Sequence, residues 1–435
     1  MSKIITASII GTGARGRLAY GSRLLKFPEQ IKVVAVADID PIKLNLCGDE
    51  HGIPSEMRFN SAEELLKQPK LSDLLFICNQ DRDHFHSAIP ALEKGYDIIL
   101  EKPISPSLEE CKKIAEKAAE CGRKVLVCHV LRYTPFYSKL KELIDSKVIG
   151  DIVTVNAEEA VGYWHQAHSF VRGNWRNSNE TSPMILAKCC HDMDILLWLL
   201  GKKCLKVSSF GSLKHFKPEN APEGSADRCC NCPEEVKAKC PYEVKKFYID
   251  GPIGLKNGYY GWPRKVVMGK DPTIENVTEA LKTGPYGRCV YKCDNDVVDN
   301  QIVNMLLEDN VTVNFTMSAF SADTDRSIRI RGTHGEIIGK WASDEIKLTV
   351  FGKEPIIFNP HNSSKKDGAG DTGGHGGGDI GLIKSIINLF GKGETSPSVT
   401  YIDKSIESHF VALAAENSRV NGGSVVDMKE WTEKF

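Results

Sequence analysis

Five apolar runs in the first part of the chain lack the polar alternation of a strand that is exposed on one face. They are ASIIG, VVAVAD, LLFIC, DIILE and KVLVCHV, and helical patterns or turns separate them. Strands that are buried on both faces have this pattern, and they occur in parallel sheets covered by helices. One helix has clear boundaries in the sequence. Ser107 and Glu110 form a capping box at its start, and Gly122 supplies a left-handed C-terminal cap. We expect an α/β domain over residues 1–130.

The pattern changes after residue 130. The runs VTVNFTMSAF, RSIRIRGTHGEIIGKW and EIKLTVFG alternate apolar with polar residues. An antiparallel sheet with one solvated face has this period. The length of 435 residues also exceeds what one hydrophobic core usually serves. We therefore expect a second domain of α+β type with a mainly antiparallel sheet over residues 131–435.

Composition excludes several classes of protein. The net charge is -1, 26% of the residues are charged, and no long basic block occurs, so nucleic acid is not an expected partner. No apolar stretch reaches 18 residues, and the first residues do not resemble a secretion signal. We expect a soluble, cytoplasmic protein without a membrane segment. Most of the 14 cysteines are thinly scattered and are expected to be reduced.

The segment GTGARG stands between the first apolar run and a helical pattern. Gly11 permits a tight turn, Gly13 lets the backbone approach a pyrophosphate, and Gly16 allows the helix and strand to pack closely. Asp38 ends the second strand, where a carboxylate binds the ribose hydroxyls of NAD and repels a 2'-phosphate. These residues predict a dinucleotide site that prefers NAD.

Two alternatives stay open at this turn. Arg15 and Arg17 could accept the additional phosphate of NADP, which we regard as the less favoured cofactor. Asp40 could compete with Asp38 for the ribose.

A longer ordered pattern occupies residues 76–107, FICNQDRDHFHSAIPALEKGYDIILEKPISPS. It resembles the segment shared by the Gfo/Idh/MocA family of glucose-fructose oxidoreductases and inositol dehydrogenases. The matching residues are Asn79, His84, Ala88, Leu92, Gly95, Glu101, Lys102 and Pro103. The resemblance covers at least residues 5–200 and implies a Rossmann domain that binds NAD. The expected cofactor-binding residues are Gly11, Thr12, Gly13, Ala14, Arg15, Gly16, Asp38, Asn79, His84, Glu101 and Lys102.

The resemblance also implies catalytic residues. The family lysine points at the substrate hydroxyl beside the nicotinamide, and this role carries over to Lys102. The segment ILAKCCHDMDILLWLLG corresponds to the family pattern Asp-x-Gly-x-His-x-x-Asp. His191 and Asp194 match that pattern, whereas Ala187 stands at its first aspartate and Cys189 at its glycine.

Lys188 has no counterpart in this pattern. It precedes His191 by three residues, so that on one helix the two side chains share a face. We predict that His191 takes the hydroxyl proton, while Lys102 and Lys188 polarise or neutralise the oxygen. A buried structural histidine is the alternative. The adjacent Cys189 and Cys190 are expected in the core, because both cannot share the face of the histidine.

Two further stretches have the character of substrate loops. Residues 161–183 combine aromatic rings with hydrogen-bond donors, which suits a sugar, although a loop packed on its own aromatics is the alternative. Residues 367–383 are rich in glycine, and Asp379 could simply cap the following helix. Sugar-active members of the family carry a similar HGGGD element. The expected substrate-binding residues are Trp164, His165, His168, Arg172, Trp175, His375 and Asp379.

A cysteine-containing insertion spans about residues 218–295. Cys229 and Cys232 have the spacing of two ligands of one tetrahedral ion, and Cys240 could be a third. Cys293 is the expected fourth ligand of a structural zinc ion, with Cys289 as its alternative. A redox pair, an iron-sulfur cluster or reduced thiols are the competing interpretations.

Taken with the resemblance, these features predict an NAD-dependent oxidoreductase that oxidises a secondary hydroxyl, at C3, of a sugar or glycoside. One alternative is an NAD-dependent glycoside-cleaving enzyme that oxidises C3 transiently and then eliminates the aglycone. Another is a non-catalytic sensor that binds NAD and sugar. The resemblance further implies a homo-oligomer that assembles through the C-terminal sheet.

Overall fold

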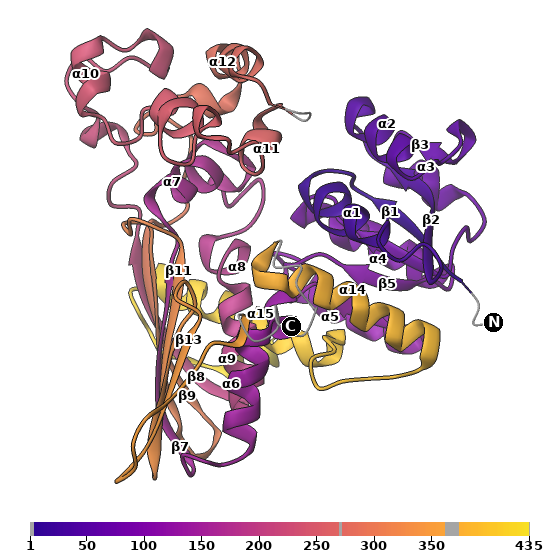
Figure 1. Cartoon of the computed structure of the whole chain (residues 1–435). Helices are drawn as coiled ribbons and strands as arrows, with labels where there is room; N and C mark the ends of the chain where they lie inside the picture. The colour runs from indigo at the N-terminus through magenta and orange to yellow at the C-terminus, as the bar shows by residue number, and fades with distance from the viewer. Residues whose placement is uncertain (1–3, 269–271, 362–373, 435) are drawn as a thin grey trace.

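The computed structural model describes residues 4–268, 272–361 and 374–434. Two sheets organise the chain, one on the right and one seen almost edge-on on the left in Figure 1. The first is a parallel sheet of Rossmann type, and the second is mostly antiparallel, so the predicted α/β fold class is confirmed. No helix in the described ranges is long and apolar enough to cross a membrane.

The first sheet has six strands in the order β3-β2-β1-β4-β5-β6. The order runs outward in both directions from the β1–β4 pair, and open α/β sheets bind ligands at the carboxyl ends of such a pair. The strands are β1 (Ile5–Ile10), β2 (Ile31–Ala37), β3 (Arg58–Phe59), β4 (Leu74–Ile77), β5 (Asp97–Leu100) and β6 (Val125–Val127). The helices include α1 (Ser22–Leu24), α2 (Pro41–Glu50), α3 (Ala62–Lys67), α4 (His84–Glu93) and α5 (Leu108–Glu120).

The second sheet has nine strands in the order β14-β13-β12-β11-β7-β10-β9-β8-β15, and within it only β7 and β10 pair in parallel. Helices α6 (Pro135–Asp145), α9 (Cys190–Leu200) and α15 (Ile402–Val420) cover one face, between this sheet and the first domain (Figure 1). The strands are β7 (Ile152–Ala160), β8 (Cys204–Ser212), β9 (Asn300–Leu307), β10 (Thr312–Ser318), β11 (Asp325–Gly332), β12 (Gly335–Lys340), β13 (Glu345–Val350), β14 (Ile356–Phe358) and β15 (Val426–Asp427).

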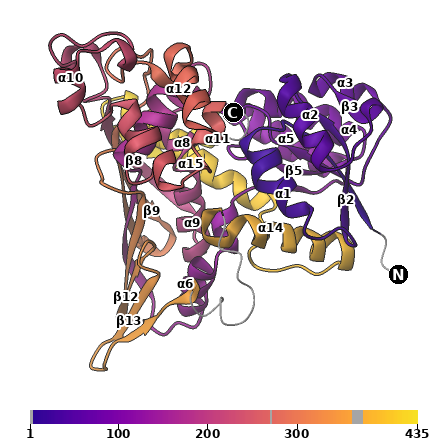
Figure 2. The same ribbon diagram turned by 45° about the horizontal axis from the view of Figure 1, so that its top comes forward.

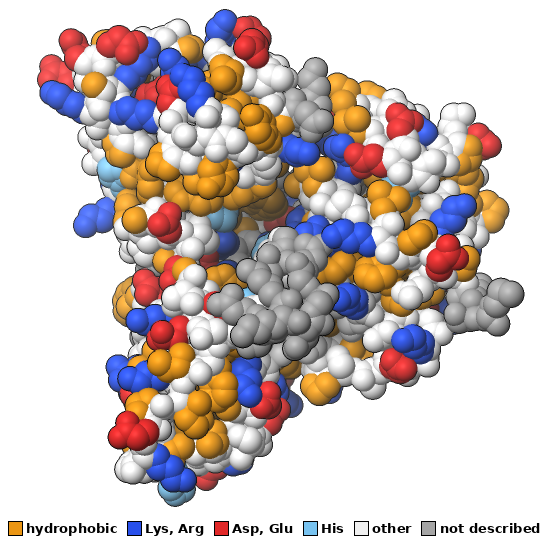
Figure 3. All heavy atoms as spheres, viewed as in Figure 1, with side chains coloured by type: hydrophobic (Ala, Val, Ile, Leu, Met, Phe, Trp, Pro, Cys, Tyr) orange, Lys and Arg blue, Asp and Glu red, His pale blue; other side chains and the backbone are white. Residues whose placement is uncertain are grey.

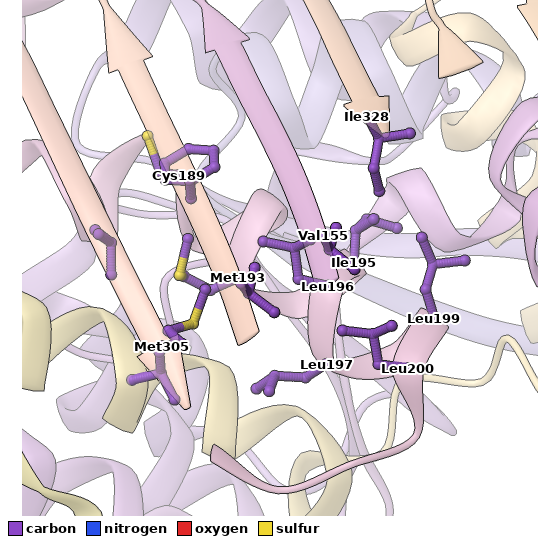
Figure 4. Close-up of a cluster of buried hydrophobic side chains, with 14 of the residues drawn as sticks. Val155, Cys189, Met193, Ile195, Leu196, Leu197, Leu199, Leu200, Met305 and Ile328 are labelled. Atoms are coloured by element: carbon purple, nitrogen blue, oxygen red, sulfur yellow. The ribbon is translucent and has the colours of Figure 1, made fainter. Parts of the chain in front are cut away.

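Helix α9 is fixed by its apolar residues. Figure 4 shows Met193, Ile195 and Leu196 packed with Val155 of β7 in one buried cluster. Burying each such side chain contributes roughly 1.5–3 kcal/mol, so this anchoring makes the first turn of α9 a rigid support. Cys189 belongs to the same cluster, as predicted for a core thiol.

The insertion lies between β8 and β9 and projects beyond one end of the second sheet (Figures 1 and 2). It contains α10 (Glu234–Lys239), α11 (Arg264–Met268) and α12 (Ile274–Thr283). Two small apolar clusters hold it together, one around Phe216 and one around Tyr248. The insertion is therefore packed through its own side chains.

A C-terminal segment returns to the first domain. Helix α14 (Gly378–Ile387) buries Leu382, Ile383 and Ile386 in the same apolar cluster as strand β1. The Thr400 carbonyl then accepts a hydrogen bond of 2.9 Å from the Val127 amide of β6. Helix α14 and Thr400 therefore pack with the first domain although they lie near the C-terminal end of the chain. The domain division at residue 130 stays a prediction.

Candidate active site

The glycine turn after β1 has the shape that a dinucleotide needs. Gly11 has a φ of +83°, and a Cβ there would lie 2.4 Å from the Cys78 carbonyl carbon. A Cβ on Gly16 would lie 2.0 Å from the Gly11 oxygen, so these two positions require glycine. No atom lies within 4 Å of the position a Cβ would take on Gly13. The backbone at Gly13 is therefore open to a pyrophosphate.

Asp38 follows β2 and supports this turn. Its Oδ2 accepts hydrogen bonds from the Thr12 amide at 2.6 Å and from the Thr12 hydroxyl at 3.0 Å. Its Oδ1 accepts one from the Asp40 amide at 2.8 Å, so Asp38 is held in place at the expected ribose position. The guanidinium of Arg17 is bound by the Glu50 carboxylate at 2.6 Å. This ion pair leaves Arg17 poorly suited to bind a 2'-phosphate.

Asn79 and His84 lie just beyond β4. The Asn79 amide donates to the Ser87 hydroxyl at 2.9 Å, while its buried Oδ1 has no hydrogen-bond partner among the described residues. His84 Nδ1 lies 2.7 Å from the Pro103 carbonyl oxygen. His84 therefore orients the backbone directly after Lys102, whereas Asn79 has an acceptor available at the edge of the sheet.

Arg15 and Glu101 connect the glycine turn to the C-terminal segment. Arg15 Nε donates to Glu101 at 2.7 Å, and Nη2 donates to Asp379 at 3.0 Å. Tyr20 also donates to Glu101. Burial raises the pKa of the Glu101 carboxyl, but Arg15 and Lys102 outweigh burial and lower that pKa. The structure thus places Arg15 and Glu101 in an ionised bridge between chain segments.

Lys102 reaches from the first domain to the predicted catalytic segment. Its amide donates to Glu101 at 2.9 Å, and its ammonium donates to the Ala187 carbonyl at 2.8 Å. Ala187 ends helix α8 (Met184–Ala187), directly before the residues that were predicted to bind substrate oxygen. An ammonium has three N–H groups, so two remain for a ligand.

His191 lies in the first turn of α9 and is buried. Its Nδ1 has no hydrogen-bond partner in the described part of the chain. The imidazole centroid lies 5.8 Å from that of His375 and 5.8 Å from that of His129. Burial, assisted by the charge of Lys102, holds the pKa of His191 well below its usual range. The imidazole is therefore neutral at pH 7.

The expectation that Lys188 and His191 share one helix face is wrong. Helix α8 ends at Ala187 and α9 begins at Cys190, so Lys188 lies in the break between them. Its ammonium lies 3.0 Å from the carboxylate of Glu159 on β7. The tertiary contact with this buried acid decides where the lysine points, and helical spacing does not.

Glu159 is shared by two cations. Its second oxygen lies 2.6 Å from Arg326 Nη2, and Arg326 Nε donates to Asp192 at 2.8 Å. Burial together with the negative charge of Glu159 raises the pKa of Asp192 to about 6, although Arg326 opposes the shift. Sequence patterns did not indicate Glu159 or Arg326, because each looks like an ordinary charged residue of a strand.

Asp194 has a structural role in this arrangement. Arg132 binds it through Nε at 2.7 Å and through Nη2 at 2.5 Å. Such a bidentate pair fixes the orientation of both planar groups. Arg132 therefore anchors α9 to the segment that follows β6, and this contact was not predicted.

The HGGGD element brings a second histidine to the site. His375 Nδ1 lies 3.2 Å from Asp379. Although burial raises the pKa of Asp379, Arg15 and His375 hold it well below its usual range, so the carboxylate is ionised. Asp379 makes no capping hydrogen bond at the start of α14, and the capping explanation is therefore wrong. Residues 367–373 of the predicted loop lie outside the described residues.

His165 of the aromatic loop lies within the electrostatic influence of Lys188. Burial lowers its pKa strongly, and the next largest cause is the charge of Lys188. Its ring stacks on Trp164 at 5.6 Å and meets the edge of Trp262 at 4.9 Å. Trp164 also stacks on Phe247 of the insertion at 5.5 Å. The loop and the insertion therefore form one aromatic wall beside the site.

His168 and Arg172 contact residues of the insertion. His168 Nδ1 is 2.7 Å from the Tyr248 hydroxyl, and the histidine is almost fully buried. Arg172 donates to the backbone carbonyls of Arg288 and Tyr242, each at 2.8 Å. These partners occupy both side chains, so the structure does not bring them to the lysines and His191.

Trp175 fastens the same loop to the first domain. Its indole N–H donates to Asp81 at 3.3 Å, and Ser182 donates to the other Asp81 oxygen at 2.5 Å. Asn174 donates to Gln80 at 3.0 Å. The loop is thereby held across the junction between the two domains.

The cysteines of the insertion do not form the predicted zinc site. Cys229, Cys232, Cys240 and Cys289 line one small pocket, whereas Cys293 contacts the Cys289 carbonyl instead. Within the described ranges, no group of three or more His, Cys, Asp or Glu side chains lies close enough to hold a metal ion. Zinc is therefore unsupported, and all of these cysteines are free thiols.

Comparisons with known proteins identify the family of the chain. A family profile described as an oxidoreductase family with an NAD-binding Rossmann fold matches residues 5–129, and the profile of its C-terminal alpha/beta domain matches residues 141–369. The chain is 24% identical over 376 residues to YteT of Bacillus subtilis, which is named as an oxidoreductase, with 83% of each sequence covered.

A second relative is an inositol 2-dehydrogenase/D-chiro-inositol 3-dehydrogenase of Lactiplantibacillus plantarum, 24% identical over 50% of this chain and 59% of that protein. An oxidoreductase from Agrobacterium radiobacter, solved with NAD+, L-tartaric acid and magnesium, has a similar fold. Its TM-score is 0.67 at 15% identity, and the match covers 99% of this chain and 100% of the other. Because the two profiles together span most of its length, the chain belongs to the Gfo/Idh/MocA family of NAD-binding oxidoreductases.

Proposed function

We propose that this protein is an NAD-dependent dehydrogenase that oxidises a secondary hydroxyl, at C3, of a sugar or glycoside. The observation that carries the proposal is the position of His191. Its neutral imidazole has an Nδ1 without a hydrogen-bond partner among the described residues, and it lies under the influence of the charge of Lys102, which follows β5 at the carboxyl edge of the parallel sheet. A base and a cation at this edge suit the removal of a proton from an alcohol.

The residues of the first domain fit NAD. The open backbone at Gly13 accepts the pyrophosphate, and Asp38 is held where it can bind the ribose hydroxyls. Arg17 is paired with Glu50 and Arg15 with Glu101, which favours NAD over NADP. When bound, the nicotinamide accepts the hydride from the carbinol carbon.

The chain itself handles the proton and the charge on oxygen. His191 accepts the hydroxyl proton on a ring nitrogen, because its lowered pKa leaves the imidazole unprotonated at neutral pH. The two remaining N–H groups of Lys102 bind the substrate oxygen and stabilise its developing negative charge. Lys188, oriented by Glu159, binds a neighbouring hydroxyl.

Aromatic rings beside these groups support a sugar as the substrate. Trp164 and His165 stack on each other beside these groups, and a sugar packs its C–H groups on aromatic surfaces while its hydroxyls take directional hydrogen bonds. Inositol dehydrogenases among the relatives act on similar polyols by their names. Oxidation at C3 rests on similarity to sugar-active members of the family.

A substrate screen tests the proposal. Purified protein with NAD and single sugars or methyl glycosides should give NADH absorbance and a product that is 2 Da lighter by mass. Wild-type protein that binds NAD but converts none of these compounds would favour a non-catalytic sensor instead. If His191→Asn turns over substrate as fast as the wild type, His191 is not the base.

A second candidate function is cleavage of a glycoside through transient oxidation at C3. The observation that favours it is His375, whose ring lies 5.8 Å from His191 and is oriented by Asp379. His375 would take the C2 proton of the 3-keto sugar as the C1–O bond breaks, and the departing oxygen would take a proton from water. Water would then add at C1, and return of the hydride to C3 would restore NAD. His168 is unsuited to this task, because Tyr248 occupies its Nδ1. Release of aglycone without net NADH would distinguish this reaction from simple oxidation.

Assembly through the second sheet stays part of the proposal. Its uncovered face exposes Phe210 of β8 and Ile302 of β9, which pair with each other and are 53% and 38% exposed. Apolar side chains on an open sheet face are typical of contacts between copies. Light scattering should give a mass that is a multiple of 48.1 kDa, whereas a monomeric mass would contradict the expectation.

A further inference from the structure

We propose that the segment Tyr259–Arg264 of the insertion is a second sugar subsite, so that the substrate is an oligosaccharide or a disaccharide glycoside. This inference rests on the proposed oxidation of a sugar and adds where the next ring of the substrate binds. The segment reads YYGWPR and precedes and begins helix α11.

Three large rings in this segment are left open to solvent. Trp262 is 44% exposed, Tyr259 52% and Tyr260 54%. Between them, no atom lies within 4 Å of the position a Cβ would take on Gly261, so the backbone leaves space beside the rings. Exposed aromatic rings that gather in four residues are unusual on a surface without a ligand.

Trp262 connects this segment to the candidate active site. Trp262 meets the edge of His165 at 4.9 Å, and His165 is in turn affected by the charge of Lys188. Trp262 also lies 5.7 Å from Trp164. Figure 3 shows hydrophobic side chains along the edge of the insertion that borders a hollow, in which histidine side chains are visible. A ring attached to a sugar at the catalytic groups would therefore extend toward these aromatics.

The segment is anchored from behind. Arg264 is buried, and its Nη1 donates to the Trp262 carbonyl at 2.9 Å. The Arg264 guanidinium lies 5.7 Å from the centre of the Phe247 ring, which itself stacks on Trp164. This anchoring preorganises Trp262 beside the site, and a preorganised ring loses less entropy when a ligand binds.

The half-exposed state of the rings favours a sugar as the occupant. A sugar ring stacks one C–H face on an aromatic side chain and keeps its hydroxyls in water. A flat apolar aglycone gains most from an enclosed slot, whereas Tyr259 and Tyr260 keep about half of their area in solvent. The platform therefore selects glycosides whose neighbouring group is another sugar.

The test compares kcat/KM for methyl glucoside and methyl galactoside with that for maltose, cellobiose and lactose. In the wild type, at least one disaccharide should exceed its methyl glycoside about tenfold, in line with the size of a stacking contact. Tyr260→Ala and Trp262→Ala should each remove most of this preference, and Trp262→Phe should keep part of it. Phe351→Ala, which removes an exposed ring from the turn after β13, should leave the preference unchanged.

A wild-type preference that survives both alanine variants would overturn the subsite, and so would the absence of any preference. Failure of the proposed oxidation is separable, because sugar binding does not require turnover. If no compound is oxidised, quenching of tryptophan fluorescence by the same disaccharides with NAD present still reports the subsite. Equal quenching in the wild type and in Tyr260→Ala would then count against it.

Discussion

Two buried histidines, His191 and His168, show what separates a reactive group from a packed one. Burial lowers the pKa of both, that of His168 to about 3. His168 has used its Nδ1 on Tyr248 and stacks on Tyr286 at 4.6 Å, whereas His191 Nδ1 has no partner among the described residues. Burial and a shifted pKa therefore do not identify the base. An unpartnered nitrogen does not identify it alone either, because both ring nitrogens of buried His129 also lack a hydrogen-bond partner among the described residues. The family pattern, together with the neighbouring Lys102, selects His191 as the proposed base.

The largest expected difference is in turnover. His191→Asn removes the proton acceptor and should lower kcat about 1,000-fold, within the range for general-base catalysis, while NAD binding by fluorescence is kept. His168→Asn should lower kcat less than about tenfold, because this residue lies away from the lysines. It should instead reduce the free energy of unfolding by about 1–3 kcal/mol, since Tyr248 loses its buried partner.

An equal loss of kcat in His191→Asn and His168→Asn would contradict the distinction between the two histidines. It would mean that packing in the insertion controls the site as strongly as the proton acceptor does. Urea unfolding of each variant separates the two causes, because His191→Asn should change stability less than His168→Asn.

Glu159 is buried and already paired, so its substitution should lower stability more than it lowers turnover. Glu159 contacts both Lys188 and Arg326. Glu159→Gln leaves two buried cations with a neutral partner and should reduce the free energy of unfolding by about 3 kcal/mol in urea. Glu158→Gln is the matched control, because the neighbouring side chain is exposed and should change stability by less than about 0.5 kcal/mol. Similar values for the two variants would contradict the role of the network.

Lys102, unlike Glu159, has N–H groups that are still available to bind substrate. Lys102→Met should lower kcat about 100-fold, the size expected for losing one donor to a developing negative charge. The positive charge of Lys102 lowers the pKa of His191, so its removal should raise that pKa. The acidic limb of the pH–rate profile should accordingly move to higher pH. An unchanged limb would show that the two groups are not neighbours during the reaction.

The smallest expected effect is on acid stability. Because the folded pKa of His168 is about 3 and its unfolded value about 6.5, the unfolded state binds protons first as the pH falls. The stability contributed by neutral His168 is complete above pH 6.5 and is lost toward pH 3, at about 1.4 kcal/mol per pH unit. Urea unfolding at pH 7.5 and 5.5 should therefore show a smaller decrease for His168→Phe than for the wild type. The same decrease in the free energy of unfolding for the wild type and for His168→Phe would contradict the lowered pKa of His168.

Much of the fold was predictable from local patterns. Strand β4 is buried on both faces, as the run LLFIC indicated, and Gly11 has the positive φ that its turn requires. The alternation in β10 places Val313 and Phe315 in the core. These features depend on residues that are close in sequence, so the pattern itself contains the information.

The break between α8 and α9 and the role of Asp379 were not predictable in this way. A helical period runs through residues 185–201, yet Lys188 leaves it to contact Glu159. Asp379 has a cap-like position but binds Arg15 and His375 instead. In both cases a buried ion pair outweighs a local preference that is worth about 1 kcal/mol or less.

The sequence by itself determined the two types of sheet and the glycine turn after β1, and its resemblance to the family predicts Lys102 and His191 as the catalytic pair. Only the tertiary structure decided which groups surround that pair. Arg15 and Asp379 are 364 residues apart, and Arg326 and Asp192 are 134 apart. Periodicity describes which face of its own element a residue occupies. The pairing of distant charges depends on how those elements pack, because a buried charge is stable only beside the partner that packing brings to it.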